Sequence, residues 1–223
     1  MHIGLFGGIG PAATDFYYRR LISAFATRKV QLELTIVHAH TPTYLTNVAN
    51  KRTADQVASY TMLAKRLAAA GAECVAISSV AGHFCIGEFN MMSPIPVVDM
   101  IPEVNRTIEQ RGYKRVGVLG TRAAMETRLL GGVTTAEIVP PTGKDLEDVH
   151  NAYVEMATTG IVTATQCVVF NRVCQRLLNE GHAEAIMLGG TDLVLAFSEE
   201  TAAFPLIDCA AIHVDAIATL AVS

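Results

Sequence analysis

The sequence predicts an α/β protein made of two similar lobes, each with a parallel four-stranded sheet flanked by helices. Two observations carry this prediction. Short apolar runs, rich in leucine and β-branched residues, alternate with longer helical patterns, which is typical of parallel sheets buried on both faces. The order of landmarks in the first half of the chain then returns in the second half at a nearly constant spacing.

Apolar periodicity places the individual elements. The predicted strands are His2–Phe6, Leu32–Val37, Cys74–Ile77, Val97–Val98, Val116–Leu119, Glu137–Val139, Ala185–Leu188 and Leu206–Ile207. The predicted helices are Thr14–Phe25, Ala54–Ala70, Ile101–Arg111, Glu126–Leu130, Leu146–Ala157, Ala164–Glu180 and Ala210–Val222.

Three segments of the first half resemble three segments of the second half in the same order. The matched pairs are 4–8 with 117–121, 71–79 with 182–190, and 96–99 with 205–208, at offsets of 113, 111 and 109 residues. An internal duplication explains these offsets, although α/β proteins also reuse such strings. The prediction is two lobes related by a pseudo-twofold axis, one from residues 1–98 plus 206–223 and the other from residues 99–205. Since ligands of open parallel sheets bind beyond the carboxyl ends of the strands, we expect a ligand cleft between the lobes.

Composition disfavours several classes of function. The 223 residues carry a net charge of −4 without a cluster of Lys or Arg, which argues against nucleic acid as a partner. The apolar N-terminus lacks a basic segment, and no uncharged apolar run reaches the ~18 residues that a membrane helix needs. Five cysteines without a CxxC pair favour a reducing compartment over disulfides or zinc. We therefore expect a soluble, cytoplasmic, metal-free protein, and the sparse charge with 51% hydrophobic residues favours a homodimer.

A glycine-rich loop follows the first predicted strand. Gly8, Ile9 and Gly10 precede Pro11, near the start of the first helical pattern. Glycines allow close backbone approach, and the N–H groups of such a loop bind a carboxylate or a phosphate. The string also fits the G-x-G-x-x-A pattern of dinucleotide sites, but the second strand leads into His38 and offers no carboxylate for a ribose. A small-anion site is favoured, with a dinucleotide site or a purely structural turn as alternatives.

Several motifs resemble those of the aspartate/glutamate racemase superfamily over essentially the whole chain. They are the opening Gly7-Gly8-Ile9-Gly10-Pro11-Ala12-Ala13-Thr14, the segment end Gly82-His83, Leu119-Gly120-Thr121, Leu188-Gly189-Gly190-Thr191-Asp192, and Asp208-Cys209-Ala210-Ala211-Ile212-His213. The resemblance implies a homodimer that moves a proton at the carbon next to a carboxylate without a cofactor, using two thiols on opposite faces of the substrate. A thiol suits this task because its pKa near ~8.5 can be lowered locally.

The chain departs from that family pattern at both thiols. The two cysteine positions are Ser79 and Gly190, and Tyr44 stands where the family has an arginine that clamps a second carboxylate. A serine hydroxyl is a poor base without an activating neighbour, and glycine has no side chain at all. Appreciable racemisation of aspartate or glutamate is therefore not expected. Cysteines restored at positions 79 and 190 together are expected to raise it.

The candidate site residues form two groups. The catalytic candidates are Ser79, Asp192 and His213. The candidates for substrate binding are Gly8, Ile9, Gly10, Tyr44, His83, Thr121, Gly190 and Thr191. Structural alternatives stay open, namely an inert hydroxyl at Ser79, buried hydrogen bonds at the two histidines, and a helix-terminal carboxylate at Asp192.

These features predict isomerase- or lyase-like chemistry on a small carboxylate, independent of pyridoxal phosphate or any other cofactor. A one-sided reaction, such as decarboxylation with proton delivery from one face, fits the empty position at Gly190. The alternative is a non-catalytic binder of small anions or an inactive paralogue, because both thiols are missing while the glycine-rich loop is kept.

Overall fold

The computed structural model describes residues 1–200 and 202–221, and it contains two four-stranded sheets in which all strand pairs are parallel. The first sheet has the order β2-β1-β3-β4 and the second the order β6-β5-β7-β8. The strands are β1 (His2–Gly7), β2 (Glu33–His38), β3 (Cys74–Ile77), β4 (Val97–Val98), β5 (Arg115–Gly120), β6 (Glu137–Val139), β7 (Ala185–Gly189) and β8 (Leu206–Asp208). The predicted α/β fold with two equivalent parallel sheets is confirmed.

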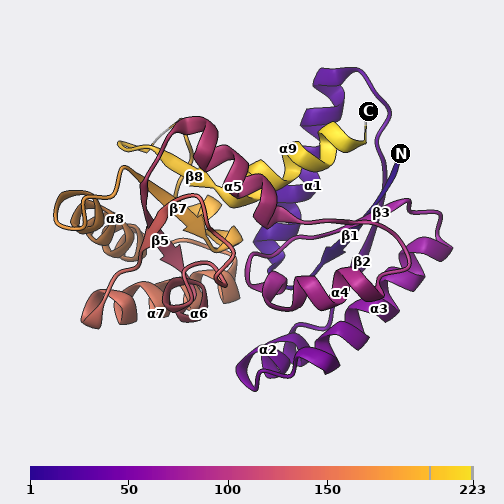
Figure 1. The fold of residues 1–223 in the computed structure, drawn as a ribbon, viewed down its shortest axis with the longest axis horizontal. Helices are drawn as coiled ribbons and strands as arrows, with labels where there is room; N and C mark the ends of the chain where they lie inside the picture. Colours follow the sequence, from indigo (N-terminus) through magenta and orange to yellow (C-terminus); the bar gives the residue numbers. More distant parts are fainter. Residues whose placement is uncertain (201, 222–223) are drawn as a thin grey trace. The chain divides into compact units, whose positions relative to one another are not determined.

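Helices fill the connections between the strands (Figure 1). They are α1 (Pro11–Arg28), α2 (Thr41–Ala49), α3 (Thr53–Ala69), α4 (Ile86–Met92), α5 (Met100–Arg111), α6 (Arg122–Glu126), α7 (Gly143–Thr159), α8 (Ala164–Asn179) and α9 (Cys209–Leu220). Two 3₁₀ turns, η1 (Ala81–Cys85) and η2 (Thr191–Leu195), follow β3 and β7. Among the described residues, no helix is both long enough and apolar enough to cross a membrane.

The helices differ from the predicted ones in three respects. The helix expected at Glu126–Leu130 lies at Arg122–Glu126, because Thr121 caps its first turn and residues 128–130 have positive φ angles that end it. The short helices α2 and α4 were not predicted. The last helix was expected to reach Val222; it ends at Leu220, and residue 222 lies outside the described part of the chain.

The chain forms two compact units, Met1–Asp99 with His213–Ser223 and Met100–Ile212. This division differs from the expected one, which gave residues 206–223 to the first lobe. The reason is that β8 pairs with β7, with Ile186 opposite Leu206, and therefore completes the second sheet. Pro205-Leu206-Ile207-Asp208 thus takes the place in the second sheet that Pro96-Val97-Val98-Asp99 takes in the first.

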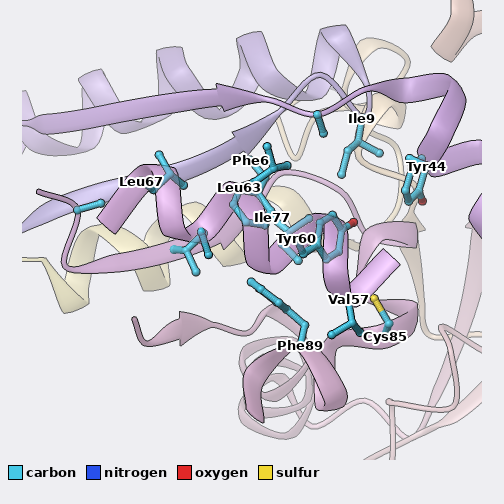
Figure 2. Close-up of a cluster of buried hydrophobic side chains, with 14 residues drawn as sticks. Phe6, Ile9, Tyr44, Val57, Tyr60, Leu63, Leu67, Ile77, Cys85 and Phe89 are labelled. Atoms are coloured by element: carbon cyan, nitrogen blue, oxygen red, sulfur yellow. The ribbon is translucent and has the colours of Figure 1, made fainter. Parts of the chain in front are cut away.

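The first sheet is covered on both faces. Figure 1 shows α1 and the C-terminal part of α9 on one face and α3 with α4 on the other. Because successive side chains of a strand point to opposite faces, Leu5 and Phe6 pack against the helices of opposite faces. The rings of Phe6, Tyr60 and Phe89 pack together in the α3–α4 layer, with centroids 5.2 to 5.7 Å apart, and Figure 2 shows this core cluster.

Candidate functional site

The glycine-rich loop between β1 and α1 is held open by its own hydrogen bonds. The Gly8 N–H donates to Thr14 Oγ1 at 2.9 Å, and the Thr14 hydroxyl donates to the Gly10 carbonyl at 2.9 Å. Gly8 has φ +83°, and a Cβ atom there would lie 2.5 Å from His38 Cε1, so only glycine fits without strain. This packing brings His38 from the end of β2 against the loop.

Two backbone N–H groups of this loop are available to a ligand. Within the described residues, the N–H groups of Ile9 and Gly10 donate no hydrogen bond, and α1 begins directly afterwards with Pro11. A helix N-terminus carries partial positive charge and unpaired donors, which favour a carboxylate or a phosphate. The first turn of α2 closes on the same loop, because the Thr41 hydroxyl donates to the Gly8 carbonyl.

Ser79 is fixed at the carboxyl end of β3, next to the end of β1. The hydroxyl of the preceding residue, Ser78, donates to the Phe6 carbonyl at 2.7 Å. Ser79 is 7% exposed, and its Oγ accepts a hydrogen bond from the Gly82 N–H at 3.2 Å. Its hydroxyl hydrogen is not used in that contact, so Ser79 retains the capacity to donate.

His83 supports the backbone of Ser79. The ring of His83 donates from Nδ1 to the Ser79 carbonyl at 2.7 Å, which fixes the tautomer because a carbonyl only accepts. Burial lowers the pKa of His83, while the Asp99 carboxylate partly opposes this effect. His83 therefore lies at the candidate site as a neutral ring that positions Ser79.

His213 has no nitrogen left for proton exchange. The Tyr17 hydroxyl donates to Nδ1 at 2.9 Å, and Nε2 donates to the Val98 carbonyl at 2.8 Å. Burial and the neighbouring His83 ring, 5.7 Å away between centroids, lower the pKa of His213 to about 3. Both nitrogens of His213 are therefore engaged in a neutral ring, which agrees with the structural alternative, and the catalytic role expected from the sequence stays a prediction.

Tyr44 lies at one end of the core cluster, on the side of Ile9 and Cys85 (Figure 2). Its hydroxyl is buried beside the Ser79 side chain, yet it forms no hydrogen bond of acceptable geometry within the described residues. Burial raises the pKa of the Tyr44 phenol well above its ordinary value, and the nearby Ser79 hydroxyl partly offsets this. The phenol is therefore a hydrogen-bond donor at neutral pH and not a base.

In the second unit, Tyr153 occupies the space of a side chain at position 190. A Cβ atom built on Gly190 would lie 2.5 Å from Tyr153 Cζ and 2.7 Å from its hydroxyl oxygen. The backbone of Gly190 is extended, with φ −143°, so the obstacle is steric and not conformational. The Tyr153 hydroxyl donates to Asp192 Oδ2 at 3.1 Å, and both residues are buried. A cysteine restored at position 190 would collide with this ring.

The two threonines of the second unit are also at the strand ends. Thr121 directly follows β5, and its Oγ1 accepts from the Ala124 N–H at 3.2 Å as the cap of α6. Thr191 follows Gly190 and is buried. Because Gly120 pairs with Gly189 in the sheet, both threonines lie at the same edge.

The structure thus gathers the predicted residues in two groups, one in each unit. The first group is Gly8, Ile9, Gly10, Tyr44, Ser79 and His83, with His213 behind it. The second group is Thr121, Gly190, Thr191 and Asp192.

Sequence reasoning missed Tyr153, which belongs to the second group through its contacts with Gly190 and Asp192. A signal was present. Tyr44 and Tyr153 are 109 residues apart, an offset that lies within the range of the internal repeat. Each comes from the first helix after the second strand of its sheet, and each reaches a residue just beyond the third strand, which is Ser79, two residues after β3, or Gly190, directly after β7.

No cysteine replaces the two missing thiols. Cys74, Cys85, Cys174 and Cys209 are buried, and burial raises the pKa of each thiol, to about 12 for Cys85 and Cys174. Such thiols are poor bases and poor nucleophiles at neutral pH. In the part of the chain that the structure describes, no three His, Cys, Asp or Glu side chains gather as a metal site.

Equivalent parallel sheets, with a buried tyrosine beside the residue after each third strand, define a duplicated α/β protein with strand-end sites. The chain belongs to the Asp/Glu/hydantoin racemase family, whose model matches residues 6–217. It resembles a Yersinia pestis protein grouped with the Asp/Glu racemases, with 25% identity over 100% of both chains and a TM-score of 0.86. An aspartate racemase homologue from Pyrococcus horikoshii OT3 is 24% identical over 100% of this chain and 99% of its own, with a TM-score of 0.79.

A more distant structure carries a ligand. Glutamate racemase from Francisella tularensis in complex with D-glutamate is 17% identical over 98% of this chain and 80% of its own, with a TM-score of 0.69. At this identity the likeness concerns the fold.

Proposed function

We propose that this chain binds a small carboxylate and does not racemise amino acids through a pair of thiols. The observation that carries the proposal is the contact between Tyr153 and Gly190. Racemisation needs a proton acceptor on one face of the substrate carbon and a donor on the other. At one of the two family positions the side chain is a serine, and at the other a tyrosine ring fills the space of the side chain.

Binding of a carboxylate is supported by the glycine-rich loop of the first unit. The N–H groups of Ile9 and Gly10 and the start of α1 supply donors and a favourable dipole, and the loop geometry is fixed by Thr14 and Thr41. A related family member was solved with D-glutamate, an amino-acid carboxylate of suitable class. The proposal needs no cofactor, because a carboxylate is recognised here by backbone and hydroxyl donors.

A second candidate function is one-sided proton transfer by Tyr153 and Asp192. The specific observation in its favour is the buried hydrogen bond of 3.1 Å between the phenol and the carboxylate, next to the position where the family thiol would stand. In this isomerase- or lyase-like reaction, the substrate Cα–H bond breaks and its proton goes to the phenol oxygen, while the phenol proton passes to Asp192 and the electron pair stays on the enolate. After exchange with water, the reverse step delivers a solvent proton to the same face of the enolate.

Calorimetric titration and solvent exchange together test these functions. Aspartate, glutamate, their amides and propionate are titrated into the protein, and each amino acid is also incubated with it in deuterated water. Measurable binding without deuterium at Cα supports the binder. Deuterium entry with retained configuration supports one-sided transfer. Ready interconversion of D- and L-aspartate with deuterium at Cα would contradict the proposal.

We further propose that the protein is a cytoplasmic homodimer, as its composition and the family suggest. Light scattering should then report twice the chain mass of 23.9 kDa. A single species of the monomer mass at working concentration would contradict the dimer.

A further inference from the structure

The Tyr44 hydroxyl is a buried polar group that forms no hydrogen bond of acceptable geometry in the described part of the chain, although Ser79 lies beside it. Tyr44 is 5% exposed, and among the described residues its hydroxyl is the only buried side-chain oxygen or nitrogen for which the geometry gives no hydrogen bond. A buried hydroxyl that has lost its water and has no acceptor lowers the stability of the folded protein, so its presence calls for an explanation. A phenylalanine would fill the same space without this cost.

A second hydroxyl lies beside it. Ser79 is close enough to Tyr44 for its hydroxyl to act on the phenol pKa. The Ser79 oxygen accepts from Gly82, which leaves its hydrogen free to be donated elsewhere. Two neutral O–H donors from α2 and from the end of β3 are therefore adjacent.

This pair is connected to the glycine-rich loop. Thr41 and Tyr44 belong to the first turn of α2, and the Thr41 hydroxyl holds the Gly8 carbonyl. Ser79 follows β3, which pairs with β1 directly before that loop. We therefore expect a ligand whose carboxylate is bound by the loop to extend towards the two hydroxyls.

Within the described residues, no lysine or arginine acts on the pKa of the Tyr44 phenol. The groups that act electrostatically on the pKa values of Tyr44, Tyr60 and Cys85 are one another and the Glu88 carboxylate. Among the described residues of the first unit, Arg19, Arg20 and Arg52 form exposed ion pairs with aspartates. A second carboxylate placed against Tyr44 would be desolvated without an opposite charge, which is unfavourable.

We propose that the Tyr44 and Ser79 hydroxyls bind one neutral oxygen of the ligand, so that the site selects monocarboxylates with a carbonyl, carboxamide or hydroxyl group over dicarboxylates. The proposal rests on the proposed carboxylate binding and names the class of ligand for the same site. A neutral oxygen accepts from both hydroxyls and satisfies the Tyr44 phenol. A carboxylate at that place lacks the counterion that its burial requires.

Paired ligands of equal size test the proposal with the full-length protein. Calorimetry compares L-asparagine with L-aspartate and L-glutamine with L-glutamate, which differ only in whether the second group is neutral or charged. Propionate reports binding by the loop alone. In the wild-type protein, at least one amide should bind about tenfold or more tightly than its acid, a ratio typical of one or two hydrogen bonds.

Tyr44→Phe removes the hydroxyl and keeps the ring. This variant should lower the affinity for the amide about tenfold, leave propionate within about threefold, and unfold at the same temperature as the wild type or higher. Ser79→Ala should reduce the preference for the amide in the same way. Tyr60→Phe is the matched control, because its buried hydroxyl donates to the Gly82 carbonyl at 3.3 Å. It should lose stability and keep the preference for the amide.

The outcomes separate the two proposals. If propionate and the acids bind, but the amides bind no more tightly or Tyr44→Phe leaves the ratio unchanged, the neutral-oxygen site is wrong and carboxylate binding stands. If Tyr44→Phe lowers stability without affecting any ligand, the hydroxyl has a structural partner and the site is equally wrong. If no ligand of the set binds, carboxylate binding itself fails.

Discussion

Tyr44 and Tyr153 each come from the first helix after the second strand of their sheet, Tyr44 from its first turn and Tyr153 from its third, but only the Tyr153 hydroxyl forms a hydrogen bond within the described residues. The Tyr153 hydroxyl donates to Asp192, whereas the Tyr44 hydroxyl lies beside Ser79 without a hydrogen bond in the described structure. The residues just beyond the third strands differ. Gly190 lets the ring of Tyr153 lie on the backbone, whereas Ser79 has a side chain of its own. The two repeated units therefore carry chemically different groups just beyond their third strands.

Gly190→Ala should destabilise the protein by roughly 1–3 kcal/mol, because the new methyl group overlaps the Tyr153 ring. In a Tyr153→Ala background the same change should cost less than about 0.5 kcal/mol, which gives a coupling of about 1 kcal/mol or more. Urea unfolding of the four proteins measures this cycle. Gly87→Ala is the control, since a Cβ there meets nothing within 4 Å. Additive effects at 190 and 153 would show that the ring does not fill this space.

Cysteines at positions 79 and 190 should not restore racemisation by themselves. This prediction differs from the expectation drawn from the sequence, because a side chain at position 190 would displace the ring of Tyr153. The triple variant Ser79→Cys, Gly190→Cys, Tyr153→Ala should introduce more deuterium at Cα of a bound amino acid than the double cysteine variant. The measurement is proton NMR in deuterated water. Equal exchange by the double and triple variants would refute the steric argument.

The buried histidine His213 should make stability depend on pH. Its folded pKa of about 3 lies below the ~6.5 of an unfolded histidine, so below pH ~6.5 the unfolded chain binds a proton that the folded chain does not. The free energy of unfolding should therefore be highest above pH ~6.5 and fall towards pH 3, by up to ~1.4 kcal/mol per pH unit from this group.

His213→Gln provides the comparison, because an amide can accept from Tyr17 and donate to Val98 without titrating. The stability difference between wild type and variant, measured by urea unfolding at pH 7, 6 and 5, should shrink as the pH falls. A constant difference over this range would mean that His213 titrates alike in both states.

Native protein should react with a thiol reagent mainly at Cys167, which is partly exposed, while the other four cysteines are buried. Denaturation should release all five thiols. Labelling with Ellman's reagent before and after unfolding, followed by peptide mass spectrometry, locates the reacting residue. Fast labelling of Cys85 or Cys209 in the native state would place an accessible thiol near the strand ends and reopen thiol chemistry.

Much of the fold was predictable because local patterns specify it. The predicted strand ends lie within one or two residues of the observed ends, because a short continuous apolar run between two helical patterns is typical of a buried strand. The predicted end of the second lobe came before the last strand of its sheet, although the internal repeat already indicated that this strand belongs to it. Pro205-Leu206-Ile207-Asp208 matches the last strand of the first sheet, and that match already assigns it to the second sheet.

The sequence by itself determined the duplicated parallel fold, the glycine-rich loop, and the absence of cysteine at positions 79 and 190. These follow from periodicity and from residue identity, which need no contacts. Only the tertiary structure decided that Tyr153 fills the place of a side chain at Gly190, that both nitrogens of His213 are engaged, and that the Tyr44 hydroxyl is left unpaired. These depend on which side chains from distant segments meet after folding, because hydrogen-bond satisfaction and steric overlap are properties of packing.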